Sequence, residues 1–357
     1  MNELLRPLHL PTHGLLFIGD PHLWSHKPGR RRDASFQETV LGKISQAADI
    51  SNEKKLWPIF LGDLFHAPDD NDLPMIVELI RVLELFERTP VTLEGNHDKQ
   101  SLMLSTRNPL ALIQAVGRIE VISQPGAWAD LELAAPDGRS HRVLVGGSPY
   151  GHALPTTFKQ AFGRERPAHV DTALWLTHED LAFEGAYPGS LPLQPIVGVD
   201  MVVNGHMHGT KTPVLVEDTA YYNPGNITRV SVDMAEHLPA VWEWTPFDNP
   251  GMASATGRRV PALVQHVLNH QVAAEAFDFE GRHTAGATLI KSAPIETEQS
   301  MFVSIMRNEP QTQRTDDGTY ARETLHHLLD ERQATDDLRR ICSRLCDEAI
   351  RLHQGGA

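Results

Sequence analysis

Five apolar segments of this sequence each end in residues that can bind a metal ion. The segments end in "GDPH", "GDLFH", "GNHD", "LTHED" and "NGHMH". The ligand-type residues at these ends are Asp20, His22, Asp63, Asn96, His97, His178, His206 and His208. Imidazole, carboxylate and amide groups without a thiolate favour manganese, iron or another hard to borderline divalent ion over a structural zinc site.

A layered α/β domain would bring these segment ends together. Short apolar runs at 14–20, 55–63 and 90–96 alternate with helical patterns at 35–50 and 74–88. Ser35 and Glu38 have capping-box spacing at the start of the first predicted helix. The carboxyl ends of strands in such a sheet form a crevice, so loops distant in sequence can pool their side chains there.

A β-hairpin is predicted in the middle of the chain. The run "WADLELAAPDGRSHRVLVGGSPYG" alternates in hydropathy, turns at Asp137 and Gly138, and alternates again. Two later apolar runs, "TALWLTH" and "IVGVDMVVNGH", each end in histidine, and "PVLVEDTAYYNPGN" and "AVWEW" are expected to be the last strands of the domain.

Each motif taken alone also has a purely structural explanation. A single Asp-Pro-His is usually a turn with a solvated histidine, and Gly-Asn-His-Asp can form an Asx turn. Their joint occurrence after five apolar strands favours a metal site. One carboxylate shared by two ions holds them roughly 3.5 to 4 Å apart, which is the spacing of two-metal sites that cleave phosphoesters. The predicted chemistry is phosphoester hydrolysis.

The ordered motifs between Gly19 and His208 resemble the calcineurin-like metallophosphoesterase superfamily. The resemblance implies an α/β fold in which a two-sheet β-sandwich is flanked by helices. Within that superfamily the chain is most similar to SbcD-type DNA repair exonuclease subunits. The features that carry this closer similarity are "GDLFH", "EGNHD", "NPLALIQAVGRIEVIS", "GGSPYG" and "YYNPGNITRVS".

The resemblance also implies roles for individual residues. The ligands of one metal would be Asp20, His22, Asp63 and His208, and those of the other Asp63, Asn96, His178 and His206. The two ions would be Mn²⁺, with iron, magnesium or another divalent ion as alternatives, and Asp63 would bridge them. His97 would face the scissile phosphate, Asp98 would orient His97 by a hydrogen bond, and His66 would lie near the substrate.

Two stretches next to these motifs are less typical of the family. "HED" adds Glu179 and Asp180 after His178, where they could alter substrate access or bind the water of one ion. The run "GRRRD" follows the first metal motif. It could contact a nucleic-acid backbone or simply form a solvated loop.

The chain is predicted to have three parts. A catalytic domain spans 1–248, an accessory, capping-like segment 249–318, and a helical segment 319–357, so that a smaller C-terminal α+β and helical module follows the catalytic domain. The boundary falls in a stretch rich in Pro, Gly and Ser. The last segment carries an apolar stripe that could fold back or dock on a partner. The resemblance implies an SbcC-type ATPase as that partner, and a homodimer.

Composition limits the cellular setting and the surface. No apolar run reaches membrane-spanning length, and the N-terminus lacks a basic segment followed by an apolar one. The two cysteines, Cys342 and Cys346, suit a reducing compartment, so a cytoplasmic protein without a membrane span is expected. The net charge of -14 argues against a generally basic, nucleic-acid-coating surface. It does not exclude a nuclease, because bound cations dominate the local field of such a site.

Three functions follow from these patterns. The first is a two-metal phosphodiester hydrolase that acts on DNA as an exonuclease or endonuclease in repair or processing. The second is a small-molecule phosphatase or cyclic nucleotide phosphodiesterase. The third is a non-catalytic scaffold, and the complete ligand set together with His97 argues against it.

Overall fold

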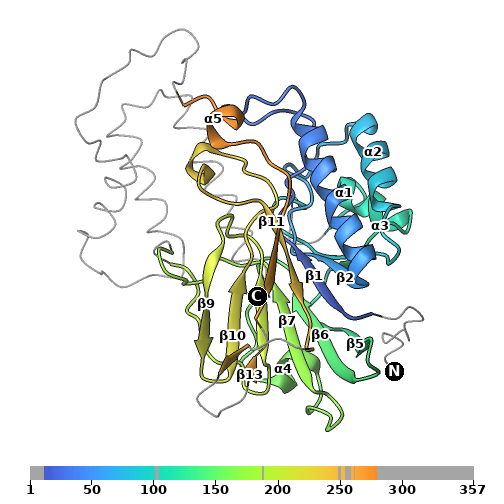
Figure 1. Ribbon diagram of the computed structural model, residues 1–357, viewed down its shortest axis with the longest axis vertical. Coiled ribbons are helices and arrows are strands. Elements are labelled where there is room, and N and C mark those ends of the chain that lie inside the picture. The colour runs from blue at the N-terminus through green and yellow to red at the C-terminus, as the bar shows by residue number, and fades with distance from the viewer. Residues whose placement is uncertain are drawn as a thin grey trace, which may run out of the picture. The chain divides into compact units, whose positions relative to one another are not determined.

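The computed structural model (Figure 1) describes residues 12–100, 104–186, 189–247, 251–253, 259–260 and 262–279. The chain divides into two compact units, Met1–Arg282 and His283–Ala357, and every described residue belongs to the first. The predicted helical segment 319–357, with its apolar stripe, lies outside the described residues.

Two six-stranded sheets form the centre of the fold. The first has the order β14-β11-β1-β2-β3-β4 and consists of β1 (Gly14–Ile18), β2 (Leu56–Phe60), β3 (Val91–Leu93), β4 (Glu120–Ile122), β11 (Ala240–Trp244) and β14 (Val264–Val267). Strands β1 to β4 run parallel, β11 pairs antiparallel with β1, and β14 pairs antiparallel with β11.

The second sheet has the order β5-β6-β7-β8-β10-β9. It consists of β5 (Gly126–Ala134), β6 (Ser140–Ser148), β7 (Thr172–Thr177), β8 (Met201–Asn204), β9 (Lys211–Val216) and β10 (Thr219–Asn223). Its four central strands are parallel, and β5 and β9 close the two edges antiparallel. The predicted hairpin is β5–β6, and Gly138 in its turn has φ of 88°. A separate two-stranded ribbon pairs β12 (Met252–Ala253) with β13 (Arg259–Val260).

Helices cover the outer faces of the sheets. They are α1 (Phe36–Lys54), α2 (Leu73–Leu83), α3 (Pro109–Ala115) and α4 (Phe158–Phe162), and the short helix α5 (Ala273–Ala276) and a 3-10 turn at Val232–Met234 lie in the connecting loops. In Figure 1, α1, α2 and α3 lie together on the first sheet. Their apolar residues share one core with the outward side chains of β1 and β2, whereas α4 belongs to a core on the second sheet.

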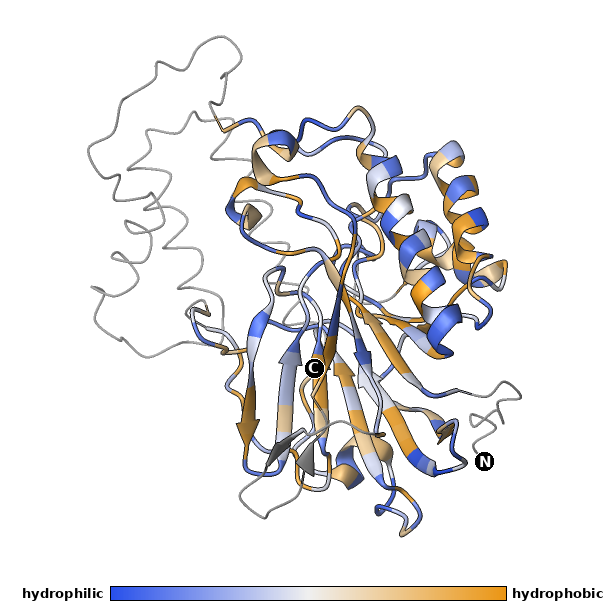
Figure 2. Cartoon of the chain, viewed as in Figure 1, coloured by the Kyte–Doolittle hydropathy of each residue, from blue (hydrophilic) through white to orange (hydrophobic). Residues whose placement is uncertain are grey.

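The side chains of β1 point alternately into two hydrophobic cores, which explains why the two sheets stack. Leu16 and Ile18 join the core under the helices, whereas Leu15 and Phe17 join the core between the two sheets. Successive side chains of a strand point to opposite faces, so a strand covered on both faces reads as a continuous apolar run. Figure 2 shows this apolar character along the central strands and mixed character on α1. The predicted two-sheet sandwich flanked by helices is confirmed.

The helix ends follow local capping rules. The side chain of Ser35 accepts a hydrogen bond from the backbone N–H of Glu38 at 3.2 Å, so α1 begins where the sequence predicts. Helix α2 ends at Leu83, earlier than the predicted Arg88. The chain turns there, and Phe86 packs against Phe60 with ring centroids 6.2 Å apart. Burial of this aromatic side chain outweighs continuation of the helix.

Strand β14 comes from the predicted accessory segment. Its residues pair with β11 in the register Ala240↔Val267 to Glu243↔Val264, which extends the first sheet beyond the predicted last strand. Within the described part of the chain, no helix has the length and apolar character needed to cross a membrane.

Candidate metal centre

Loops at the carboxyl ends of five parallel strands meet at one place between the sheets. Asp20 and His22 follow β1, Asp63 follows β2, and Asn96 and His97 follow β3 in the first sheet. His178 follows β7, and His206 and His208 follow β8, in the second sheet. Both sheets therefore contribute side chains to one site, which the strand order alone cannot show.

The predicted ligands lie in two groups. Ligand atoms of Asp20, His22 and His208 lie within 4.8 Å of one another, and so do those of Asp63, His178 and His206. In the first group, His22 Nε2 is 3.1 Å from His208 Nε2. In the second group, Asn96 Oδ1 is 3.3 Å from His178 Nε2 and 3.0 Å from His206 Nδ1.

Asp63 lies between the two groups. Its Oδ2 is 3.7 Å from His22 Nε2 and 3.2 Å from His178 Nε2. Its Oδ1 accepts a hydrogen bond from the backbone N–H of His97 at 2.8 Å, which fixes the carboxylate. This position is the one that a bridging carboxylate would need, and bridging remains a prediction.

The backbone is strained at three of these positions. His22, Asp63 and His206 have φ of 49°, 46° and 67°. Non-glycine residues adopt such values at a cost of order 1–3 kcal/mol each, and such residues cluster at functional sites. The surrounding fold thus forces these side chains into the site.

Glycines that precede the ligands make room for them. A Cβ on Gly95 would lie 2.0 Å from Asp63 Oδ1, and one on Gly205 would lie 2.8 Å from Asp20 Oδ1. A Cβ on Gly62, which has φ of 105°, would lie 2.4 Å from His178 Nδ1. The motif analysis did not assign these glycines a role, although each stands directly before a ligand in the sequence.

The electrostatics of the group favour bound cations. Burial raises the pKa of Asp20 to about 7, against the opposing effect of His178. Burial alone would raise the pKa of Asp63, but the imidazoles of His178 and His22 lower it. Burial would lower the pKa of His178, but the carboxylates of Asp63 and Asp20 raise it to about 10. The buried carboxylates therefore attract positive charge to this site.

Unsatisfied polar atoms fit a pair of divalent ions. Both carboxylate oxygens of Asp20, Oδ2 of Asp63 and Nδ1 of His22 are buried without a hydrogen-bond partner among the described residues. Leaving such groups unpaired would be costly. His178 Nδ1 donates to the backbone oxygen of Leu61 at 2.6 Å, so its Nε2 is left for a ligand. Carboxylate, imidazole and amide donors suit divalent ions, and the residues fit the two-metal prediction.

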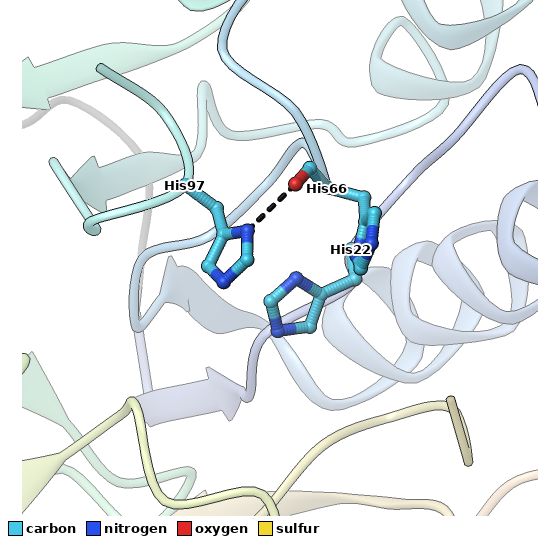
Figure 3. Close-up of side chains that lie close together, drawn as sticks. All are labelled: His22, His66 and His97. Carbon is cyan, nitrogen blue, oxygen red and sulfur yellow. Dashed lines mark hydrogen bonds between the residues drawn. The ribbon is translucent and has the colours of Figure 1, made fainter. Parts of the chain in front are cut away.

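His66 and His97 lie beside the first group (Figure 3). The rings of His22 and His97 are 4.9 Å apart, and those of His66 and His97 are 5.3 Å apart and stacked. His97 Nδ1 donates to the backbone oxygen of His66 at 2.6 Å. The second ring nitrogen, Nε2, is therefore the one that could contact a substrate or an ion. Trp24, which sequence reasoning did not single out, packs on His66 with centroids 4.3 Å apart.

Asp98 does not have the predicted contact with His97. It is fully buried, and its two oxygens accept the backbone N–H groups of Phe65 at 3.1 Å and Gly95 at 3.0 Å. The carbonyl of His66 orients His97 instead. Asp98 therefore fixes the two loops that carry Asp63 and Asn96. The sequence neighbours His97 and Asp98 point to different partners, which the motif could not reveal.

The two acidic residues after His178 have different environments. Glu179 is 8% exposed and accepts the backbone N–H of Gly151 at 2.7 Å, so it supports the loop rather than the substrate. Asp180 lines the cleft that opens on the metal centre.

Asn226 is a buried polar residue near the site that the motif analysis missed. Both of its side-chain amide atoms are unpartnered among the described residues. Its backbone N–H donates to the backbone oxygen of His208 at 2.9 Å, so the residue supports the loop that carries a predicted ligand.

A cleft of about 820 Å³ opens on this site. Asp63, His97, His206 and His208 line it together with residues farther along the cleft. The family model for calcineurin-like phosphoesterases matches residues 14–210, which include every predicted metal ligand. The chain belongs to the calcineurin-like phosphoesterase family. It is a metal-dependent phosphoesterase, and the clustered ligand side chains are its candidate metal centre.

Similarity of this phosphoesterase to individual proteins is remote. No curated protein matches it. Among solved structures, an archaeal phosphodiesterase is 15% identical over 71% of this chain and 99% of that one, with a TM-score of 0.33. A 5'-nucleotidase precursor from Thermus thermophilus is 13% identical over 71% of this chain and 54% of that one, with a TM-score of 0.39. The NAD nucleotidase of Haemophilus influenzae is 12% identical over 71% of this chain and 50% of that one, with a TM-score of 0.37.

Proposed function

We propose that this phosphoesterase hydrolyses phosphodiesters, with DNA ends as its substrate, in the manner of SbcD-type nucleases. The position and orientation of His97 are the observation that supports this reaction type. His97 borders the cleft, its Nδ1 is held by the His66 carbonyl, and its Nε2 is left to face a substrate. An alkoxide is a poor leaving group, so a positioned imidazole that protonates it accelerates diester cleavage.

The clustered ligands supply the rest of the site. Divalent ions held there would polarise the phosphoryl oxygens and activate water. Mn²⁺ is the proposed ion because the donors are imidazole, carboxylate and amide groups. The ring of His22 lies 4.9 Å from that of His97 and 5.4 Å from that of His66, so both histidines border the same predicted ligand. We assign His97 to the leaving oxygen and His66 to contact with the phosphate.

DNA as the substrate rests on the motifs that resemble SbcD-type subunits, "GDLFH" with His66 among them. The same resemblance underlies the proposals of an SbcC-type ATPase partner and of a homodimer. The helical segment expected to contact the partner, 319–357, lies outside the described residues.

A small phosphodiester is the second candidate, and the lining of the cleft favours it. Beyond the ligands, the cleft is bordered by Asp180, Asp233, Glu236 and Lys211, three acidic residues and one lysine. DNA-binding surfaces rely on Lys and Arg, whereas these carboxylates would repel a polyanion. A neutral or cationic leaving group would suit them.

One assay separates these substrates. The full-length protein is incubated with Mn²⁺ and end-labelled duplex or single-stranded DNA, and in parallel with p-nitrophenyl phosphate, its bis ester and cyclic nucleotides. Loss of the label from DNA, with the bis ester cleaved faster than the monoester, is the expected result. Turnover of the small esters alone would refute DNA as the substrate and leave phosphodiester hydrolysis standing.

A charge variant sharpens the comparison. Asp233→Asn removes one cleft carboxylate at an exposed position of the 3-10 turn, which holds no predicted ligand. If DNA occupies this part of the cleft, the variant lowers KM for DNA, most strongly at low ionic strength where the carboxylate is least screened, while the KM for the bis ester stays the same. Lys211→Met should have the opposite effect on DNA.

A further inference from the structure

A second cavity, of about 400 Å³, is lined by positively charged side chains. It lies between α1 and the chain around 269–276, and Arg31, Lys43 and Arg229 all border it. The segment from Arg229 to Pro239 borders this cavity and also the catalytic cleft, since Glu236 and His237 line the cleft. Arg31 belongs to the run "GRRRD", which the catalytic site does not use.

The three cationic residues are buried. Arg31 is 6% exposed, and Lys43 and Arg229 are each 4% exposed. Asp33, the buried carboxylate of the cluster, binds Arg31 with two hydrogen bonds of 2.6 Å from Nε and an Nη atom. Among the described residues, no carboxylate lies within 4.0 Å of Lys43 or Arg229. Glu38 at the rim and Glu236 near Arg229 are exposed.

Lys43 has hydrogen-bond donors that find no acceptor in the described part of the chain. Its Nζ donates to the backbone oxygen of Asn269 at 2.7 Å, and an ammonium has three donors. Burial, together with the charges of Arg229 and Arg31, lowers the pKa of Lys43 to about 8. Burying an ammonium without a counter-ion is costly. Asp33 is paired with Arg31, and among the described residues no second buried carboxylate neutralises Lys43, so an anionic ligand could supply this charge.

Arg229 is held so that it can face a ligand. Its Nη atoms donate to the backbone oxygens of Ala235 and Gln271, and its guanidinium lies over the ring of Phe277, 5.9 Å from the centroid. Arg31 lies over the same ring at 5.2 Å and donates to the backbone oxygen of Arg229. These contacts fix the positions of two guanidinium groups without neutralising Arg229. Fixed cations of this kind recognise oxyanions.

We propose that this cavity binds a small phosphate-bearing anion, with Lys43 and Arg229 as its direct partners. Two cations without a carboxylate partner match the charge of a phosphate dianion, and the volume falls within the range of small-ligand sites. Free phosphate and the phosphate of a mononucleotide share this chemistry. The site is separate from the metal centre and does not depend on the proposed function.

A purely structural role makes a different prediction. If Lys43 and Arg229 only tie the carbonyls of 269–271 to the domain, replacing Lys43 would change stability but not phosphate binding. Equilibrium dialysis of the metal-loaded full-length protein with labelled inorganic phosphate, and separately with labelled adenosine monophosphate, distinguishes the two roles. The comparison of variants removes any contribution from the catalytic centre, which Lys43 does not touch.

The expected result is one more bound phosphate or mononucleotide per chain in the wild type than in Lys43→Met. Lys43→Arg should restore binding, and Lys54→Met, on the same helix but outside the cavity, should bind like the wild type. Phosphate binding without nucleotide binding would identify the free ion, and the reverse would identify a nucleotide. Equal binding of both probes by the wild type and Lys43→Met would overturn the proposal.

A second variant covers the case in which Lys43→Met does not fold. Gln46 lines the cavity, and its Oε1 accepts the backbone N–H of Asn269 at 2.8 Å. Gln46→Glu keeps this acceptor and adds a negative charge, so it should weaken phosphate binding roughly tenfold or more with the fold intact. Unchanged binding in Gln46→Glu would also contradict the proposal.

Discussion

The Nδ1 proton of His97 is donated to the backbone carbonyl oxygen of His66, with 2.6 Å between nitrogen and oxygen. The loop after β2 therefore orients a histidine that follows β3. His97 is not one of the predicted ligands, although its ligand atom lies within 4.8 Å of those of His22 and His66. Metal content and turnover must be measured together to establish its role.

His97→Ala should keep both metals and lose activity. Removing a general acid typically lowers kcat by about 10²- to 10⁴-fold. Metal content is measured by plasma mass spectrometry after gel filtration, and kcat with a phosphodiester. His22→Ala is the matched control and should lose metal. Loss of metal from His97→Ala would show that His97 is a ligand.

Asp98→Asn should destabilise the fold. An amide keeps one acceptor oxygen and turns an NH₂ group towards the N–H of Phe65 or Gly95, leaving a buried donor unpaired. The expected loss is about 1–3 kcal/mol in the free energy of unfolding, measured by urea denaturation. The pH profile of kcat should keep its shape, because Asp98 does not contact His97. A displaced profile would instead support the hydrogen bond predicted from the sequence.

Gly95→Ala should impair the metal centre. The new Cβ would lie 2.0 Å from Asp63 Oδ1, so the carboxylate between the two ligand groups must move. A displacement of about 1 Å can cost about 10²-fold in rate. Titration with Mn²⁺ and measurement of kcat test this expectation. The control is Gly29→Ala, where an added Cβ meets no atom within 4 Å, and it should behave like the wild type.

Removal of the metals should lower thermal stability as well as activity. Without cations, the buried carboxylates of Asp20 and Asp63 lie near one another, and both oxygens of Asp20 and Oδ2 of Asp63 have no hydrogen-bond partner among the described residues. An ion that binds only the folded state stabilises it by about 2.7 kcal/mol at a concentration of about 100 Kd. Chelation followed by return of Mn²⁺ should lower and then restore Tm. A Tm unaffected by chelation in the wild type, at a dose that abolishes activity, would contradict the assigned ligands.

The stability contributed by Lys43 should increase at alkaline pH in phosphate-free buffer. Its pKa is about 8 in the folded protein, where burial and the charges of Arg229 and Arg31 lower it, with Asp33 opposing. Between about 8 and the ordinary 10.5, the unfolded chain binds more protons at this residue, so stability rises with pH. The free energy of unfolding of the wild type relative to Lys43→Met should therefore rise from about pH 8 to about pH 10. A flat or falling difference would contradict burial of the ammonium.

The sequence by itself determined the strands, the two-layer class of the fold and the types of the ligand residues. Apolar alternation is local, and the residue that follows a buried strand is fixed by chain position, so Asp20, Asp63 and His178 could be placed at strand ends from sequence alone. Ser35 could likewise be assigned as an N-cap, because capping depends on residues close together in the chain.

Only the tertiary structure decided which neighbours these residues have. The partners of Asp98 and His97 include residues of a different loop, and β14 finds β11 through pairing that no local pattern encodes. Arg31 and Arg229 lie in one cavity although 198 positions separate them. Long-range contacts depend on sheet order and packing rather than on local periodicity. The sequence therefore specified the types of the site side chains, and the tertiary structure determined which of them are in contact.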